Sequence, residues 1–89
     1  MRTIYKYLVP IVDYFDLDMP EDAHILDFQV QNGHACLWAL IWTQRAPERR
    51  YFRIIGTGHR VPDEGSPKYV GTIQTDNGRL VWHLFEVTK

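Results

Sequence analysis

Apolar and polar residues alternate with a period of two along most of this chain. In residues 15–19 the apolar side chains alternate with aspartates, and in residues 26–31 they alternate with Asp and Gln. A strand with one face on a core and one face in water has this pattern. Residues 35–42 are apolar at almost every position, which predicts a central strand that is buried on both faces.

Turn-forming residues separate these segments. Asn32-Gly33 predicts a two-residue hairpin turn, because both central positions of a type I′ turn need positive φ. Asp76-Asn77-Gly78 predicts a second tight turn, and residues 20–24 predict a turn or a single turn of helix. Strands are expected over residues 4–9, 15–19, 26–31, 35–42, 50–55, 68–75 and 80–85. We therefore predict an all-β fold, a small antiparallel β-sandwich or flattened barrel of about seven strands, in one domain over residues 1–89.

The inward positions of these strands define a predicted core. Trp38 and Trp82 lie inside apolar strands and are expected to be buried, whereas Trp42 ends its strand beside a polar loop and is expected to be exposed. The other predicted core residues are Leu8, Leu17, Leu26, Phe28, Val30, Leu37, Ala39, Ile41, Phe52, Ile54, Val70, Leu80 and Leu84.

Size and charge narrow the classes of function. A chain of 89 residues buries only about 60–65% of its unfolded surface, so a homo-oligomer is expected. A net charge of −1 gives no basic face for nucleic acid, and no apolar run is long enough to span a membrane. Cys36 is the single cysteine, which is consistent with a reducing, cytoplasmic location.

The stretch over residues 56–67 is the longest irregular segment, and it contains the first candidate site. Glycines at positions 56 and 58 allow backbone N–H groups to face an anion, and Arg60 can grip a phosphate or carboxylate. If every strand reverses direction, His34 lies at the same end of the fold. The candidate ligand- or partner-binding residues are Gly56, Thr57, Gly58, His59, Arg60 and His34. The alternative is a glycine-rich turn with solvated side chains.

A second candidate is a basic contact patch around Arg45, Arg49 and Arg50, with Arg53 nearby. Such a patch can contact an acidic partner or a phosphate, or it can be a solvated loop. The same alternation of strand direction places the turn at residues 76–78 at the arginine end, about 20 Å from His59.

Catalytic and metal-binding chemistry is less well supported by the sequence. His34 and His59 with Asp63 and Glu64 could form a zinc or acid–base site, but no closely spaced ligand pair is present. We therefore expect no cofactor, no metal and no enzymatic activity.

Four segments of the chain, at residues 30–33, 36–40, 52–59 and 81–86, together form the pattern QNG…CLWAL…RIIGTGH…VWHLFE. In this pattern the chain resembles a family of small uncharacterised bacteriophage and prophage proteins. The resemblance implies a small accessory phage protein made in the cytoplasm of a bacterial host cell, and such proteins often inhibit a bacterial host defence system. The expected function is therefore non-enzymatic binding of a host protein or a small phosphorylated ligand. Two alternatives are a structural or assembly protein of the virion and a small histidine-dependent hydrolase.

Overall fold

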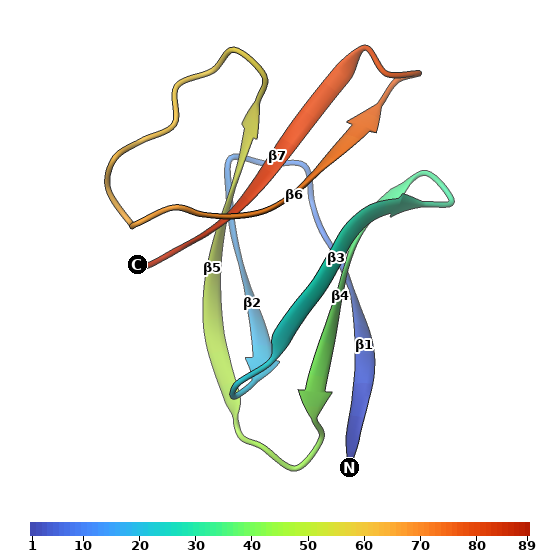
Figure 1. Cartoon of the computed structure of the whole chain (residues 1–89), viewed down its shortest axis with the longest axis vertical. Helices are drawn as coiled ribbons and strands as arrows, with labels where there is room; N and C mark the ends of the chain where they lie inside the picture. The colour runs from blue at the N-terminus through green and yellow to red at the C-terminus, as the bar shows by residue number, and fades with distance from the viewer.

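The computed structural model describes residues 1–89 and contains only strands, turns and loops. The strands are β1 (Arg2–Leu8), β2 (Tyr14–Pro20), β3 (His24–Gln31), β4 (His34–Trp42), β5 (Pro47–Gly56), β6 (Lys68–Thr75) and β7 (Leu80–Val87) (Figure 1). The prediction of an all-β fold with seven strands is confirmed. No helix is present that could cross a membrane.

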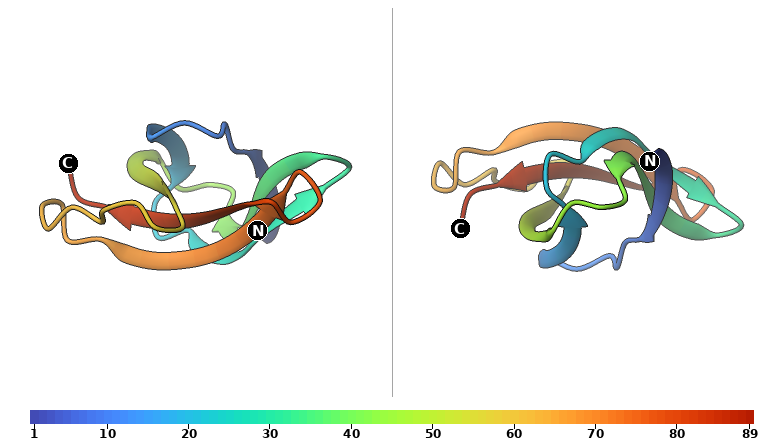
Figure 2. Two further views of the ribbon diagram at one scale, coloured as in Figure 1. Left: turned by 90° about the horizontal axis from the view of Figure 1, so that it is seen from above. Right: turned by 90° about the horizontal axis from the view of Figure 1, so that it is seen from below.

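The strands form two antiparallel sheets that do not close into a barrel. Sheet A has the order β1-β4-β3, and sheet B has the order β2-β5-β7-β6. The molecule is flat, with extents of 40 × 33 × 16 Å, as the views along the sheets show (Figure 2). Because stacked sheets lie about 10 Å apart, this thickness leaves room for two layers and no third. β4 is the central strand of sheet A, as its apolar sequence predicts.

The core lies between the inner faces of the two sheets. Phe28, Leu37, Phe52 and Leu84 are its main fully buried members. Ile25, Leu17, Val70 and Trp82 pack against this cluster from partly buried positions.

Four predicted core residues are instead exposed, namely Leu8, Leu26, Val30 and Leu80. Leu26 lies in a β-bulge, where the register of β3 against β4 shifts between Ile25 and Asp27. The extra residue reverses the alternation, so the bulge removes Leu26 from the inward face. Leu8 points outward because its neighbours Tyr7 and Val9 take the inward positions of that segment. Val30 and Leu80 lie near strand ends.

The backbone conformations of the turns agree with the residues found there. Asn32 and Gly33 have φ values of 50° and 79°, as a type I′ turn requires. Asp76, Asn77 and Gly78 also have positive φ. Residues 20–24 form a tight turn, in which the Ala23 N–H donates to the Pro20 carbonyl at 3.1 Å, and no helical turn is present.

The expectation that every strand reverses direction is wrong between β5 and β6. Both strands pair antiparallel with β7, which lies between them, so β5 and β6 run in the same direction. Gly56 at the end of β5 lies opposite Trp82, whereas Lys68 at the start of β6 lies opposite Glu86. The chain must therefore travel back about 13 Å along the sheet before β6 begins. We call residues 57–67 the return loop.

This topology changes which turns share an end of the molecule. Thr75 at the end of β6 pairs with Leu80 on β7, beyond the position of Gly56. The turn at residues 76–78 therefore lies at the same end as Gly56 and away from the arginine-rich start of β5, as Figure 1 also shows. The length of the return loop is a requirement of strand order, so length alone is no sign of a site.

Candidate functional site

The first part of the return loop is a tight turn that folds back on β5. The His59 N–H donates to the Gly56 carbonyl at 3.0 Å, and Gly58 has a φ of +89°. A Cβ added at Gly56 would lie 3.4 Å from both the His59 imidazole and the Trp82 ring. Glycine at this position therefore lets the imidazole lie close to the strand backbone, while Arg60 stays exposed.

Thr57 joins a chain of hydrogen bonds on sheet B. Its Oγ1 lies 2.7 Å from Nε2 of His83, and Nδ1 of His83 lies 2.9 Å from Oγ1 of Thr72. The Tyr69 hydroxyl continues the chain, 2.6 Å from Thr72 Oγ1. A neutral imidazole can donate from one nitrogen and accept at the other, so both hydroxyls hold the His83 ring. The Thr57 hydroxyl is thus tied to β7 by an exposed hydrogen bond.

His34 does not join the other candidate residues. It begins β4 directly after the β3–β4 turn, and Figures 1 and 2 place this turn on the opposite side of the molecule from the return loop. No group of three or more His, Cys, Asp or Glu side chains is placed to hold a metal ion.

The basic patch is matched by carboxylates of the same chain. Arg45 pairs with Asp22, and Arg49 Nε lies 3.1 Å from Asp18. Arg50 makes a two-pronged contact with Glu86. The hydrogen bond from the Arg50 guanidinium to Glu86 raises the pKa of Arg50 above its ordinary value, against the opposing effect of burial. These pairs neutralise the charges that the sequence suggested for an outside partner.

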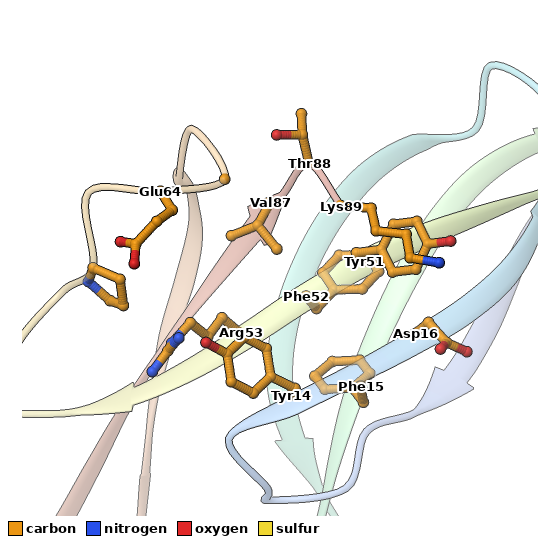
Figure 3. Close-up of a pocket in the computed structure, with 12 residues that line it drawn as sticks. Tyr14, Phe15, Asp16, Tyr51, Phe52, Arg53, Glu64, Val87, Thr88 and Lys89 are labelled. Carbon is orange, nitrogen blue, oxygen red and sulfur yellow. The ribbon is translucent and has the colours of Figure 1, made fainter.

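The largest concave site lies elsewhere, on the outer face of sheet B. It has a volume of about 540 Å³ and is bounded by β2, β5, the return loop and the C-terminal segment (Figure 3). We call it the aromatic–arginine groove. Its lining comprises Tyr14, Phe15, Asp16, Tyr51, Phe52, Arg53, Pro62, Glu64, Gly65, Val87, Thr88 and Lys89.

Strand register explains why these residues meet. Tyr14 lies opposite Arg53, and Asp16 lies opposite Tyr51. Directly paired residues of antiparallel strands project to the same face, so the four side chains share the outer face. Phe15 and Phe52 alternate with them and stack on the core side, with ring centroids 5.1 Å apart.

The return loop forms the opposite wall of the groove. The Thr88 N–H donates to the Gly65 carbonyl at 2.7 Å, which ties the loop to the C-terminal segment. Gly65 has a φ of +77°, and a Cβ there would meet the Thr88 carbonyl oxygen at 3.1 Å. Only glycine combines this backbone conformation with so close an approach, so Gly65 fixes the position of Glu64 beside the groove.

Arg53 is the chemically unusual residue of this groove. Its guanidinium lies 4.2 Å from the centroid of the Tyr14 ring, which is a cation–π contact. It has no carboxylate within ion-pairing distance, and its Nε is buried with no hydrogen-bond acceptor. Buried polar atoms nearly always have a partner, so the Nε is an unsatisfied donor, but protein atoms cover it on every side. The terminal nitrogens of the guanidinium are not covered in this way and make no hydrogen bond within the chain, so they are the atoms of Arg53 that an acceptor in the groove can contact.

Sequence reasoning did not identify this groove. The sequence places Arg53 beside the basic patch, and its position between Phe52 and Ile54 indicates an outward side chain on a half-buried strand. Which residues stand next to it depends on the pairing of β5 with β2 and on the path of the return loop. No local sequence signal specifies either.

The fold and the groove define a small two-sheet β-protein with an open groove that is lined by aromatic and charged side chains. The whole chain, residues 1–89, matches the family described as "Domain of unknown function (DUF7352)", and the protein belongs to that family. No curated protein and no solved structure matches the chain.

Proposed function

We propose that this protein is a non-enzymatic binding protein that sequesters a small phosphorylated ligand, a nucleotide, in the aromatic–arginine groove. The observation that carries the proposal is Arg53, which lines the groove and whose guanidinium makes no hydrogen bond and no ion pair within the chain. A phosphate supplies the acceptor oxygens that a guanidinium contacts in a two-pronged geometry.

The rest of the groove suits the other parts of a nucleotide. Tyr14 and Tyr51 offer aromatic rings against which a base can stack. The Glu64 carboxylate has no ion-pair partner and can accept hydrogen bonds from sugar hydroxyls or an exocyclic amine. A volume of about 540 Å³ is within the range of small-molecule sites. In this proposal the return loop acts through Pro62, Glu64 and Gly65 rather than through residues 56–60.

The biological setting that we propose is inhibition of a bacterial host defence system by removal of a signalling nucleotide. It rests on the resemblance to small bacteriophage and prophage proteins. The ligand-binding chemistry rests on the groove and stands independently of that setting.

The test is native mass spectrometry of the protein purified from phage-infected bacteria, with heat-released material separated by liquid chromatography. Three forms are compared: the unaltered protein, Arg53→Gln, and Arg60→Gln as a matched control on the exposed loop. We expect one phosphorylated small molecule per chain in the first and third forms. Loss of a charge-assisted hydrogen bond should weaken retention about 10-fold or more in Arg53→Gln.

Three other outcomes would contradict the proposal. Loss of ligand in Arg60→Gln alone would move the site to the tip of the return loop. A co-purifying host protein in place of a small molecule would show that the partner is a protein and not a phosphorylated ligand. A protein that carries nothing under all conditions, and that binds no added nucleotide, would remove the binding function.

A further inference from the structure

The outer face of sheet A carries apolar side chains that remain partly or fully exposed. On β4, Leu37, Ala39 and Ile41 enter the core, so Trp38, Leu40 and Trp42 alternate with them on the outer face. Trp38 was expected in the core, but its neighbours occupy that side. The outward residues of an antiparallel sheet are normally polar, and exposed apolar patches mark interaction sites.

The flanking strand β1 extends this apolar face. Ile4 lies directly opposite Leu40 and is 54% exposed, and Leu8 is 64% exposed. At the end of β4, two cations cover the apolar face. The guanidinium groups of Arg2 and Arg45 lie 5.4 and 5.3 Å from the centroid of the Trp42 ring. The exposed apolar surface therefore lies around the half-buried Trp38 and Leu40.

Opposite charges stand on the two sides of Trp38. Lys6 on β1 and Asp27 on β3 are both register partners of Trp38, so all three project to the outer face. Lys6 crosses the sheet to donate to Gln31 at 3.0 Å, and Asp27 accepts from Gln29 at 3.1 Å. Both contacts are exposed, and neither charge has an oppositely charged partner within the chain.

We propose that this face docks against the same face of a second copy of the chain, around a two-fold axis parallel to β4. Rotation about that axis places β1 of one copy over β3 of the other. Lys6 of each copy then faces Asp27 of its partner, and the Trp38 and Leu40 side chains meet along the axis. A two-fold axis across the strands would instead place Lys6 over Lys6 and Asp27 over Asp27, which like-charge repulsion disfavours.

The arrangement is a closed, self-complementary contact, the commonest kind among homo-oligomers. It stacks two sheets face to face, which is a standard way to cover an apolar sheet face. The aromatic–arginine groove lies on the outer face of sheet B, on the other side of the molecule, and stays open. Dimer formation and ligand binding can therefore succeed or fail separately.

The experiment is sedimentation velocity over a concentration series, with charge reversals at the two proposed partners. Lys6→Glu alone places two like-charged pairs in the interface, and so does Asp27→Lys alone. Each should weaken the dimer about 10-fold or more, whereas the matched reversal Lys68→Glu on sheet B should not change it. Thermal unfolding of every variant checks that the chain remains folded.

Mixing the two single variants gives the decisive measurement. In a mixed dimer, position 6 of the Lys6→Glu chain faces position 27 of the Asp27→Lys chain, and the remaining Lys6 faces the remaining Asp27. Both pairs are then attractive, so a heterodimer should form from two weakly associating proteins. Native mass spectrometry distinguishes it by mass.

Asp27 also accepts a hydrogen bond from the Phe28 N–H at 2.8 Å within the bulge, so Asp27→Lys can perturb folding. If it does, Trp38→Arg provides the second test, since it places two cations together on the axis and should abolish the dimer. A chain that stays monomeric at every concentration would overturn the proposal. A dimer that is insensitive to both Lys6→Glu and Trp38→Arg would also overturn it.

Discussion

Arg50 on β5 donates two hydrogen bonds to Glu86 on β7, from Nε to Oε2 at 2.6 Å and from Nη2 to Oε1 at 2.7 Å. Its third donor, Nη1, contacts the Ala23 carbonyl at 2.6 Å. One guanidinium thus joins sheet B to the turn that leads into β3 of sheet A. One of the three arginines of the predicted basic contact patch is therefore a structural link between the two sheets.

Removal of this link should destabilise the fold. In Arg50→Met the Glu86 carboxylate, whose side chain is only 23% exposed, loses its partner, and we expect a loss of about 2–3 kcal/mol in the free energy of unfolding. Urea denaturation measures it. The double variant Arg50→Met/Glu86→Leu should recover part of the loss, because no unpaired charge remains. Arg49→Ala, which removes an exposed pair, should hardly change the midpoint, and an equal loss in Arg49→Ala would contradict the assignment.

The glycine of the β6 bulge should be sensitive to a single added methyl group. A Cβ at Gly71 would lie 3.1 Å from the Cβ of Phe28, where β6 passes β3 of the other sheet. Overpacking of this kind costs about 1–3 kcal/mol, so Gly71→Ala should lower the Tm by several degrees. Gln74→Ala on the exposed face of the same strand is the control. An unchanged Tm in Gly71→Ala would show that the sheets separate easily at this point.

Substitution of two glycines with similar backbone conformations should distinguish an effect on ligand binding in the groove from an effect on overall stability. Gly65 and Gly33 have φ values of +77° and +79°, but only Gly65 has atoms within 4 Å of an added Cβ. Gly33→Ala should lower the Tm through backbone strain and leave ligand retention unchanged. Gly65→Ala carries the same strain and also pushes the return loop from Thr88, so it should reduce ligand retention as well. Equal retention in both variants, measured by native mass spectrometry, would show that Glu64 does not depend on this anchor.

Alkaline pH should reveal the burial of Tyr7. Desolvation, assisted by the nearby Tyr5 phenol, raises the pKa of Tyr7 above its ordinary value, which is about 10. The folded state therefore binds this proton more tightly than the unfolded state does. The corresponding stability is complete below about pH 10 and is lost as pH rises through the folded-state pKa. Urea midpoints between pH 9 and about 11.5 should fall less steeply in Tyr7→Phe than in the unaltered protein. Identical slopes would mean that the phenol is solvated.

The limits of sequence reasoning appear most clearly at two positions of β3. Phe28 was placed correctly in the core, because it belongs to an alternating apolar series, while Leu26 from the same series is exposed. The bulge between Ile25 and Asp27 causes the difference. A bulge is set by the fit between a strand and its neighbour, and that neighbour is distant in sequence.

At Arg53 in the candidate groove, too, the sequence predicts only part of the arrangement. Its outward direction follows from the alternation along β5, but its contact with Tyr14 and the wall that Glu64 provides do not. They depend on β2 lying beside β5 and on the return loop crossing back past the C-terminal segment.

The sequence by itself determined the seven strands, the Asn32-Gly33 hairpin turn and the central place of β4. These features follow from local backbone preferences and from the alternation of apolar and polar residues, both of which can be read from residues that are close in sequence. Only the tertiary structure decided that β7 lies between β5 and β6, that carboxylates neutralise the basic patch, and that a groove forms around Arg53. Each of these depends on pairing between residues far apart in the chain, because the energy of such contacts belongs to the assembled sheets and not to any single segment.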